Sequence, residues 1–141
     1  MAKVRKVEPC IRVVMMPRDT NPMGTIFGGI ILSFIDQAGV VEAQNYCNRK
    51  LVTVAMHEVK FIAPVFVGDL VSFYSEIIHV GNTSITVRVT VEARRGKPPH
   101  EIARVTQAEV VYVAVEEPGK PIPVRDANPL PNRGKRRTRQ S

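Results

Sequence analysis

Residues 29–46, GIILSFIDQAGVVEAQNY, form the only stretch of this chain that is long enough and free enough of breakers for a substantial helix. At 100° per residue, one wide apolar face is formed by Ile30, Ile31, Phe34, Ile35, Ala38 and Val41. The apolar surface continues round the back through Leu32, Gly39, Val40 and Ala43. A helix that is apolar on nearly all sides is a buried helix. The rest of the chain is therefore expected to enclose this segment.

Most of the remaining sequence is typical of β-strands. Segments rich in Val, Ile, Thr and aromatic residues occur at 11–16, 51–63, 70–80, 84–94 and 103–115. In SITVRVTVEAR (84–94) apolar and polar residues alternate, and this period of two indicates a half-exposed strand. The connections carry Gly, Pro, Asn and Asp, as tight links do. One buried helix followed by antiparallel strands predicts an α+β fold in which a sheet wraps around a central helix.

The length of 141 residues indicates one domain, which we assign to residues 1–124. Residues 125–141 form a Pro-containing basic tail. The last ten residues hold five of the 20 Lys and Arg and no acid, so without them the net charge of +7 falls to about +2 (15 bases against 13 acids). Such a tail could contact polyanions, but a disordered, solubilising extension is the preferred interpretation. No specific nucleic-acid partner is predicted.

Composition also limits the cellular location of the protein and the metal or cofactor chemistry expected of it. No run approaches the ~20 apolar residues of a membrane span, and no apolar segment follows the basic start MAKVRKVEPC. Cys10 and Cys47 lack CxxC spacing and are expected to be reduced thiols, so a cytoplasmic protein is predicted. No His and Cys cluster has metal-ligand spacing, and neither a metal nor a cofactor is expected.

The predicted sheet has a problem at its edges. A single curved sheet around one helix leaves two open edges, and long β-rich strands would expose them. Pairing two such sheets edge to edge removes exposed edges. A homodimer is therefore the smallest expected unit.

Asp36 lies in the middle of the predicted helix, on a largely apolar stripe. An unpaired ionised carboxylate in such a place costs several kcal/mol, so it must be paired, protonated or partly wet. A group of this kind tends to have a raised pKa, as a general base working near neutral pH needs. The alternative is a structural Asp that is hydrogen-bonded to backbone across an interface. Glu42 competes for the role but lies near the helix end.

The loop before the helix provides a complementary feature. Gly28 and Gly29 at a helix start leave backbone N–H groups free and sterically open. Together with the positive end of the helix dipole, they suit an anion or a developing oxyanion. The alternative is that they only permit a tight turn. Asn21, just before Pro22, carries an amide that could orient water or a carbonyl.

Several segments in the right order resemble the hotdog-fold acyl-CoA thioesterases of the cytosolic acyl-CoA hydrolase family, which includes the brain-type enzyme and small bacterial homologues. They are DTNPMGTIFGGIILSFIDQAG (19–39), VTVAMHEVKFIAPVFVGDLV (52–71), GNTSITVRV (81–89) and VVYVAVEEPGKPIPV (110–124). The resemblance covers roughly residues 10–124. It implies a helix wrapped by a five- or six-stranded antiparallel sheet, with active sites at a dimer interface and frequent assembly into hexamers.

The resemblance also implies the site. Asn21 and Asp36, from opposite subunits, form one active site that hydrolyses acyl-CoA to free CoA and a carboxylate. The thioester oxygen lies near the N–H groups of Gly28 and Gly29, while Asp36 activates water or attacks directly. Thr25 stands where some members have Asp or Asn, so it cannot serve as a second carboxylate. CoA belongs to the substrate, and no separate cofactor is implied.

The CoA-binding residues are less specific. The polar turn Gly81, Asn82, Thr83 and Ser84 could receive the nucleotide end, and Arg88, Arg94, Arg95 and Lys97 are candidates for the phosphates. His57 is expected to face the core or the site as a structural histidine, and Gly68-Asp69 to form a structural turn. Two alternatives stay open: a hotdog dehydratase or hydratase, and a non-catalytic acyl-CoA sensor.

Overall fold

The computed structural model describes residues 7–117 and 119–125 of the chain. Its elements, in chain order, are β1 (Ile11–Val14), the short 3₁₀ helix η1 (Pro17–Asp19), α1 (Gly28–Gln44), β2 (Lys50–His57), β3 (Leu70–Val80), β4 (Ser84–Arg95), β5 (Glu101–Glu117) and β6 (Lys120–Pro121). The predicted basic tail lies, apart from Arg125, outside the described residues.

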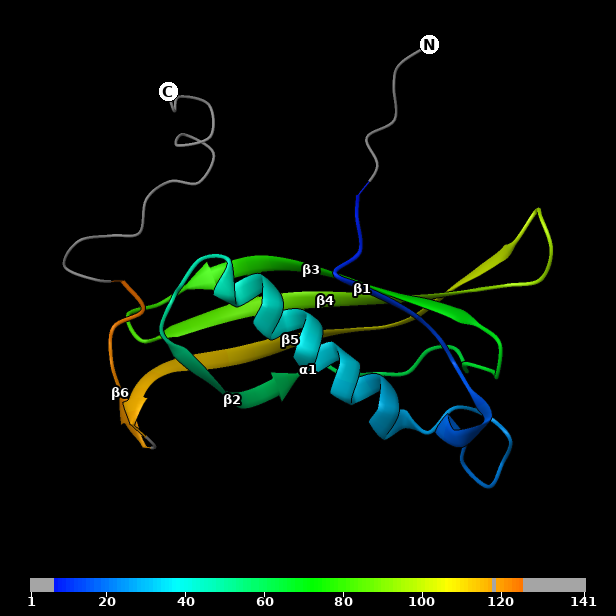
Figure 1. Cartoon of the computed structure of the whole chain (residues 1–141), viewed down its shortest axis with the longest axis horizontal. Coiled ribbons are helices and arrows are strands. Elements are labelled where there is room, and N and C mark those ends of the chain that lie inside the picture. Colours follow the sequence, from blue (N-terminus) through cyan, green and yellow to red (C-terminus); the bar gives the residue numbers. More distant parts are fainter. Residues whose placement is uncertain (1–6, 118, 126–141) are drawn as a thin grey trace, which may run out of the picture.

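The strands form one antiparallel sheet in the order β1-β3-β4-β5-β2, and β6 pairs with β5 beyond this path. Helix α1 runs diagonally across one face of the curled sheet, as Figure 1 shows. Strands β1 and β2 form the two edges. The predicted α+β architecture, a sheet wrapped around a central helix, is confirmed.

The core lies between the helix and the inner face of the sheet. On β4 the inward residues Ile85, Val87, Val89, Val91 and Ala93 are all fully buried. They alternate with outward polar residues, as the period of two predicted. From the helix, Ile31, Ile35 and Ala38 are buried in the same core. Fully burying one such Ile or Val contributes about 2 kcal/mol, so this layer is the main attachment of α1.

The opposite side of α1 is open in the single chain. Ser33, Gln37, Val41 and Gln44 are exposed, with Val41 at 46%. The prediction of a helix buried on nearly all sides is therefore wrong for one chain. The sheet curls around only one side of the helix, and the apolar Val41 is left uncovered.

Strand β2 ends earlier than predicted. A register shift between Thr53 and Ala55 inserts an extra residue, and Glu58 then adopts a positive φ of 60°. The inserted residue reverses the side-chain alternation beyond it. His57 is therefore exposed beside Glu109, and not directed at the core or the site as predicted.

A buried ion pair anchors the chain that leads into the helix. Asp69, 2% exposed, accepts hydrogen bonds from Arg95 Nε at 3.0 Å and Arg95 Nη2 at 2.7 Å, and from the Phe66 amide at 2.9 Å. These bonds raise the pKa of Arg95 above its usual value. The surrounding loop then pairs with the preceding segments: the Met15 amide donates to the Asp69 carbonyl, and the Ile26 amide donates to the Val65 carbonyl. The Gly68-Asp69 turn thus has the structural role that was predicted.

Within the described part of the chain, no helix has the length and apolar character needed to cross a membrane.

Candidate active site

Asp36 lies two turns into α1, on the side that faces strand β2. Its Oδ1 accepts a 2.7 Å hydrogen bond from the hydroxyl of Thr53. The residue is half-buried, so its carboxylate is both paired and partly accessible. An acid on an apolar stripe needs a hydrogen-bond partner or contact with water, and Asp36 has both.

Thr53 was not among the residues predicted from the sequence. It is part of the segment VTVAMHEVKFIAPVFVGDLV that carries the family resemblance, but nothing local assigns it a role. The irregularity in β2 starts immediately after Thr53. Thr53 itself lies in the regular part of the strand, two residues after Leu51 on the same face, and only its tertiary contact with Asp36 distinguishes it.

The first turn of α1 has an open N-terminus. The N-cap residue is Phe27, which provides no capping hydrogen bond, and the first turn contains no acid. Most helices use a Ser, Thr, Asp or Asn side chain at this position. The side chain of Phe27 therefore satisfies none of the N–H groups of the first turn, and the oxyanion role of Gly28 and Gly29 stays a prediction.

Of the two glycines, Gly29 is the one whose replacement would require the exposed Phe27 ring to move. A Cβ at Gly29 would lie 2.6 Å from the Phe27 ring, which is closer than real Cβ contacts. A Cβ at Gly28 would meet the Phe61 ring at an ordinary 3.6 Å. Two half-exposed aromatic rings therefore flank the helix start and give it an apolar surrounding.

Asn21 belongs to a tight loop just before the helix. Its Oδ1 accepts bonds from the amides of Met23 at 2.8 Å and Thr25 at 3.2 Å, and its Nδ2 donates to Thr25 Oγ1 at 3.0 Å. An isolated bridge between Thr20 and Ile26 closes this loop. Thr25 therefore orients Asn21, and the second N–H of the Asn21 amide can point out of the loop.

The single chain brings Asn21 and Thr25 close to the helix start, but Asp36 lies farther along. Eight residues separate Gly28 from Asp36, which is about 12 Å of helix. The Asn21 side chain forms hydrogen bonds within its own loop, while Asp36 binds Thr53. Within one chain, the hydrogen bonds of Asn21 and Asp36 therefore lead to different partners.

The predicted CoA-binding residues are also spread over the molecule. The turn Gly81–Ser84 joins β3 to β4, and backbone bonds from Ala114 to Thr83 and from Val124 to Asn82 hold it. Arg94, at the other end of β4, lies about 33 Å of strand away from Ser84. The two cannot hold one phosphate in the same chain.

Arg88 lies in the middle of β4, on the outer face of the sheet. Its guanidinium is shared between Glu76 at 3.9 Å and Glu109 at 3.6 Å. An arginine between two carboxylates is partly neutralised. Its assignment to the CoA phosphates stays a prediction.

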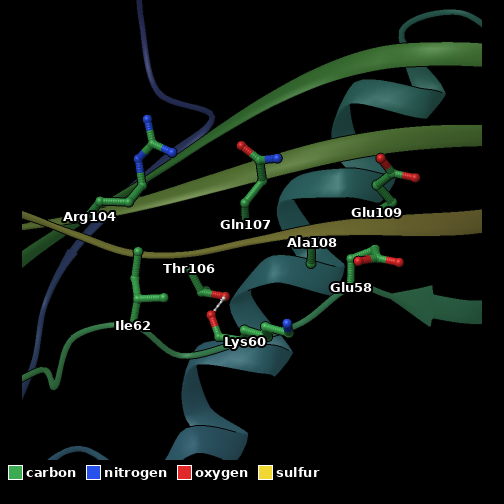
Figure 2. A pocket seen from close by; sticks show the side chains of 8 residues that line it. All are labelled: Glu58, Lys60, Ile62, Arg104, Thr106, Gln107, Ala108 and Glu109. Atoms are coloured by element: carbon green, nitrogen blue, oxygen red, sulfur yellow. Dashed lines mark hydrogen bonds between the residues drawn. The ribbon is translucent and has the colours of Figure 1, made fainter.

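A groove of about 460 Å³ lies where β2 has separated from β5, and Figure 2 shows the side chains that line it. They include Lys60 and Arg104, together with Glu58 and Glu109. The charges of the four largely balance, so the groove has no net cationic character. None of the predicted site residues lines it.

No group of three or more His, Cys, Asp or Glu side chains that could hold a metal ion occurs in residues 7–117 and 119–125.

Comparison with known proteins shows the family to which the chain belongs. A sequence profile of the Thioesterase superfamily matches residues 23–99, more than half of the chain. The acyl-CoA thioester hydrolase YciA of Salmonella typhimurium is 36% identical over 119 residues, which are 83% of this chain and 90% of that protein.

Two solved structures extend the likeness to three dimensions. Cj0915 of Campylobacter jejuni, a hexameric hotdog fold thioesterase, matches with a TM-score of 0.77 and 42% identity, over 95% of this chain and 97% of its own. HI0827, a hexameric broad specificity acyl-coenzyme A thioesterase solved as an aspartate-to-alanine mutant, matches with a TM-score of 0.79 and 35% identity, over 89% of this chain and 91% of its own.

The chain belongs to the Thioesterase superfamily and, within it, to the family of hotdog-fold acyl-CoA thioesterases. The resemblance and the hotdog fold predicted from the sequence are both confirmed.

Proposed function

We propose that this protein hydrolyses the thioester bond of acyl-CoA and releases free CoA and a carboxylate. The observation that carries the proposal is the pairing of Asp36 with Thr53 at 2.7 Å, in a half-buried position on the central helix of a thioesterase fold. The acyl-CoA hydrolase activity named for its relatives supports the substrate class.

The proposed reaction uses the helix start of one chain together with Asp36 of the other chain, because both must reach the same thioester carbonyl. The thioester carbonyl lies with its oxygen toward the N–H groups of Gly28 and Gly29, which stabilise the negative charge that develops there. Asp36 takes a proton from water, the water oxygen attacks the carbonyl carbon, and the C–S bond breaks to release the CoA thiolate. Direct attack by Asp36 is the alternative, with an anhydride that water then hydrolyses.

We infer that each complete site needs two chains. Asn21 and Asp36 have different hydrogen-bond partners in one chain, and α1 exposes a face that includes Val41. The edge strand β2, which carries Thr53, is available for pairing with a second copy. A homodimer would bring Asn21 of one chain to Asp36 of the other, and the hexameric relatives support a trimer of such dimers.

For the CoA nucleotide we propose the turn Gly81–Ser84, whose backbone is held in place from β5 and from the segment after β6. A turn with hydroxyl and amide side chains suits phosphate oxygens. Arg88 and Arg94 remain further candidates from the outer face of the sheet.

Release of free thiol from a panel of acyl-CoAs tests the proposal. The wild type is expected to turn over, and Asp36→Asn, which keeps the size of the side chain, is expected to lose activity by about 10³-fold because it can neither accept a proton nor attack. Glu42→Gln removes the other acid of α1 and is the matched control, expected to retain activity. A wild type that releases no CoA, or an Asp36→Asn variant as active as the wild type, would overturn the proposal.

The same assay separates the alternatives. A dehydratase or hydratase would interconvert enoyl- and hydroxyacyl-thioesters with no release of thiol, and a sensor would bind acyl-CoA without turnover. All three histidines, His57, His79 and His100, are exposed. No observation favours either alternative.

A further inference from the structure

Tyr112 connects the sheet to the helix at Asp36. It lies on β5 and is fully buried, and its hydroxyl donates a 2.7 Å hydrogen bond to the backbone carbonyl of Asp36. That carbonyl already lies in the middle of an α-helix, where hydrogen bonding within the helix satisfies it. The additional bond therefore fixes the position of one helical turn relative to the sheet.

Gly39 makes room for this contact. A Cβ at Gly39 would collide with the Tyr112 hydroxyl and would lie only 3.0 and 3.1 Å from two ring atoms, Cζ and Cε2. Glycine within a helix lowers its stability relative to alanine. The close approach of Tyr112 explains why position 39 of the helix is a glycine.

Tyr112 and Thr53 are also direct partners across the β2–β5 pairing. Thr53 donates to the carboxylate of Asp36, while Tyr112 donates to its main-chain carbonyl. The cross-strand pair of Thr53 and Tyr112 therefore binds both the side chain and the main chain of Asp36. The register of β2 shifts immediately after this pair.

We propose that Tyr112, with the space that Gly39 provides, is a positioning residue that sets the place of the Asp36 carboxylate by fixing the backbone of α1 beneath it. This inference rests on the proposed function, because it assumes that Asp36 carries out the chemistry. Tyr112 does not touch the substrate and acts only through Asp36.

The chemistry of the phenol fits this role. Burial, and next the negative charge of Asp36, raise the pKa of Tyr112 well above its ordinary value. The hydroxyl therefore stays protonated and remains a donor throughout the working pH range. Tyr112 neither gives nor takes the proton of the reaction.

Tyr112→Phe is the first test, because it removes the hydroxyl and keeps the ring. We expect kcat for acyl-CoA hydrolysis to fall about tenfold with KM changed less than twofold, since a small displacement of a catalytic group acts on the chemical step. The matched control is Tyr46→Phe, which removes a hydroxyl that accepts a bond from Arg125 far from Asp36. It is expected to keep the wild-type kcat. Activities are expressed per folded chain, measured by circular dichroism.

Two double variants separate positioning from general stability. If Tyr112 and Thr53 both act through Asp36, Tyr112→Phe combined with Thr53→Val should lose less kcat than the product of the single losses. Gly39→Ala should lower kcat in the wild type, but considerably less in the Tyr112→Phe background, where the hydroxyl that it displaces is absent.

The outcomes distinguish this inference from the proposed function. An Asp36→Asn variant that retains full activity would overturn the function itself. If Asp36→Asn is inactive while Tyr112→Phe retains the wild-type kcat, the positioning role is wrong and the function stands. Independent, multiplicative losses for Tyr112→Phe and Thr53→Val would also overturn the positioning role, because they would show that the two residues do not act through one group.

Discussion

The hydroxyl of Thr53, on an edge strand, donates a 2.7 Å hydrogen bond to the carboxylate of Asp36, on the central helix. The bond joins the two elements of the fold that carry the proposed chemistry. A threonine hydroxyl adds no charge, so it orients the carboxylate without neutralising it. The carboxylate can therefore remain a base.

Replacing Thr53 tests the importance of this bond. Thr53→Val keeps the shape and removes the donor, and we expect kcat to fall roughly 10- to 100-fold because Asp36 loses its fixed orientation. Thr53→Ser keeps a hydroxyl and should retain most of the activity. Steady-state kinetics of CoA release give the comparison, and equal activities of the Val and Ser variants would contradict the role of the hydroxyl.

The ion pair between Asp69 and Arg95 should be important for stability. Arg95→Met leaves a carboxylate that is 2% exposed without its cation, and we expect the free energy of unfolding to fall by about 3 kcal/mol. Arg95 also stacks over Phe66 at 4.9 Å, a contact that the change removes as well. Urea denaturation measures the difference. Arg94→Met, at the exposed neighbouring position, is the control and should cost less than about 1 kcal/mol.

The pH dependence of stability should carry the signature of Tyr112. Its pKa is raised in the folded state, mainly by burial, so the folded chain keeps this proton while the unfolded chain loses it above about pH 10. The stabilisation is present in full below that pH and is lost as the pH rises. The unfolding free energy of the wild type should thus fall more steeply above pH 10 than that of Tyr112→Phe, by up to about 1.4 kcal/mol per pH unit. Parallel profiles from denaturation at pH 8 to 11 would contradict the assignment.

The nucleotide site can be tested with two substrates. Thr83→Val in the turn Gly81–Ser84 should raise KM for an acyl-CoA severalfold and leave KM for the matching acyl-pantetheine unchanged, because the shorter substrate has no phosphates. Arg88→Gln should change the KM for neither substrate much, because the Arg88 guanidinium lies between Glu76 and Glu109. A larger effect of Arg88→Gln than of Thr83→Val would move the phosphates to the outer face of the sheet.

Local patterns predicted the elements well where a local cause determines them. The alternation of Ile85, Val87, Val89 and Val91 predicted strand β4 and its buried face, and the helix begins one residue before the predicted position. Asn21, Gly28 and Gly29 are recognisable because turn and helix-start chemistry is local.

The remaining features depend on tertiary contacts. The register shift after Thr53 and the positive φ of Glu58 arise where β2 meets β5, and they turn His57 outward. The bond between Thr53 and Asp36 joins the sheet to the helix across 17 residues of sequence. Strand alternation alone would have continued β2 to residue 63. The contact of Tyr112 with Gly39 joins positions 73 residues apart, and no local sequence pattern predicts it.

Complementation tests whether Asn21 and Asp36 form one site from two chains. Asn21→Ala and Asp36→Asn chains are each expected to be nearly inactive alone. When the two are unfolded together and refolded as an equal mixture, half of the dimers are mixed, and each mixed dimer has one site with both residues intact.

The measured quantity is CoA release by that mixture. We expect a recovery of about one quarter of the wild-type activity, because half of the dimers carry one intact site out of two. Activity that stays at the level of the separate variants, in a mixture shown to contain mixed dimers, would contradict a site shared between two chains.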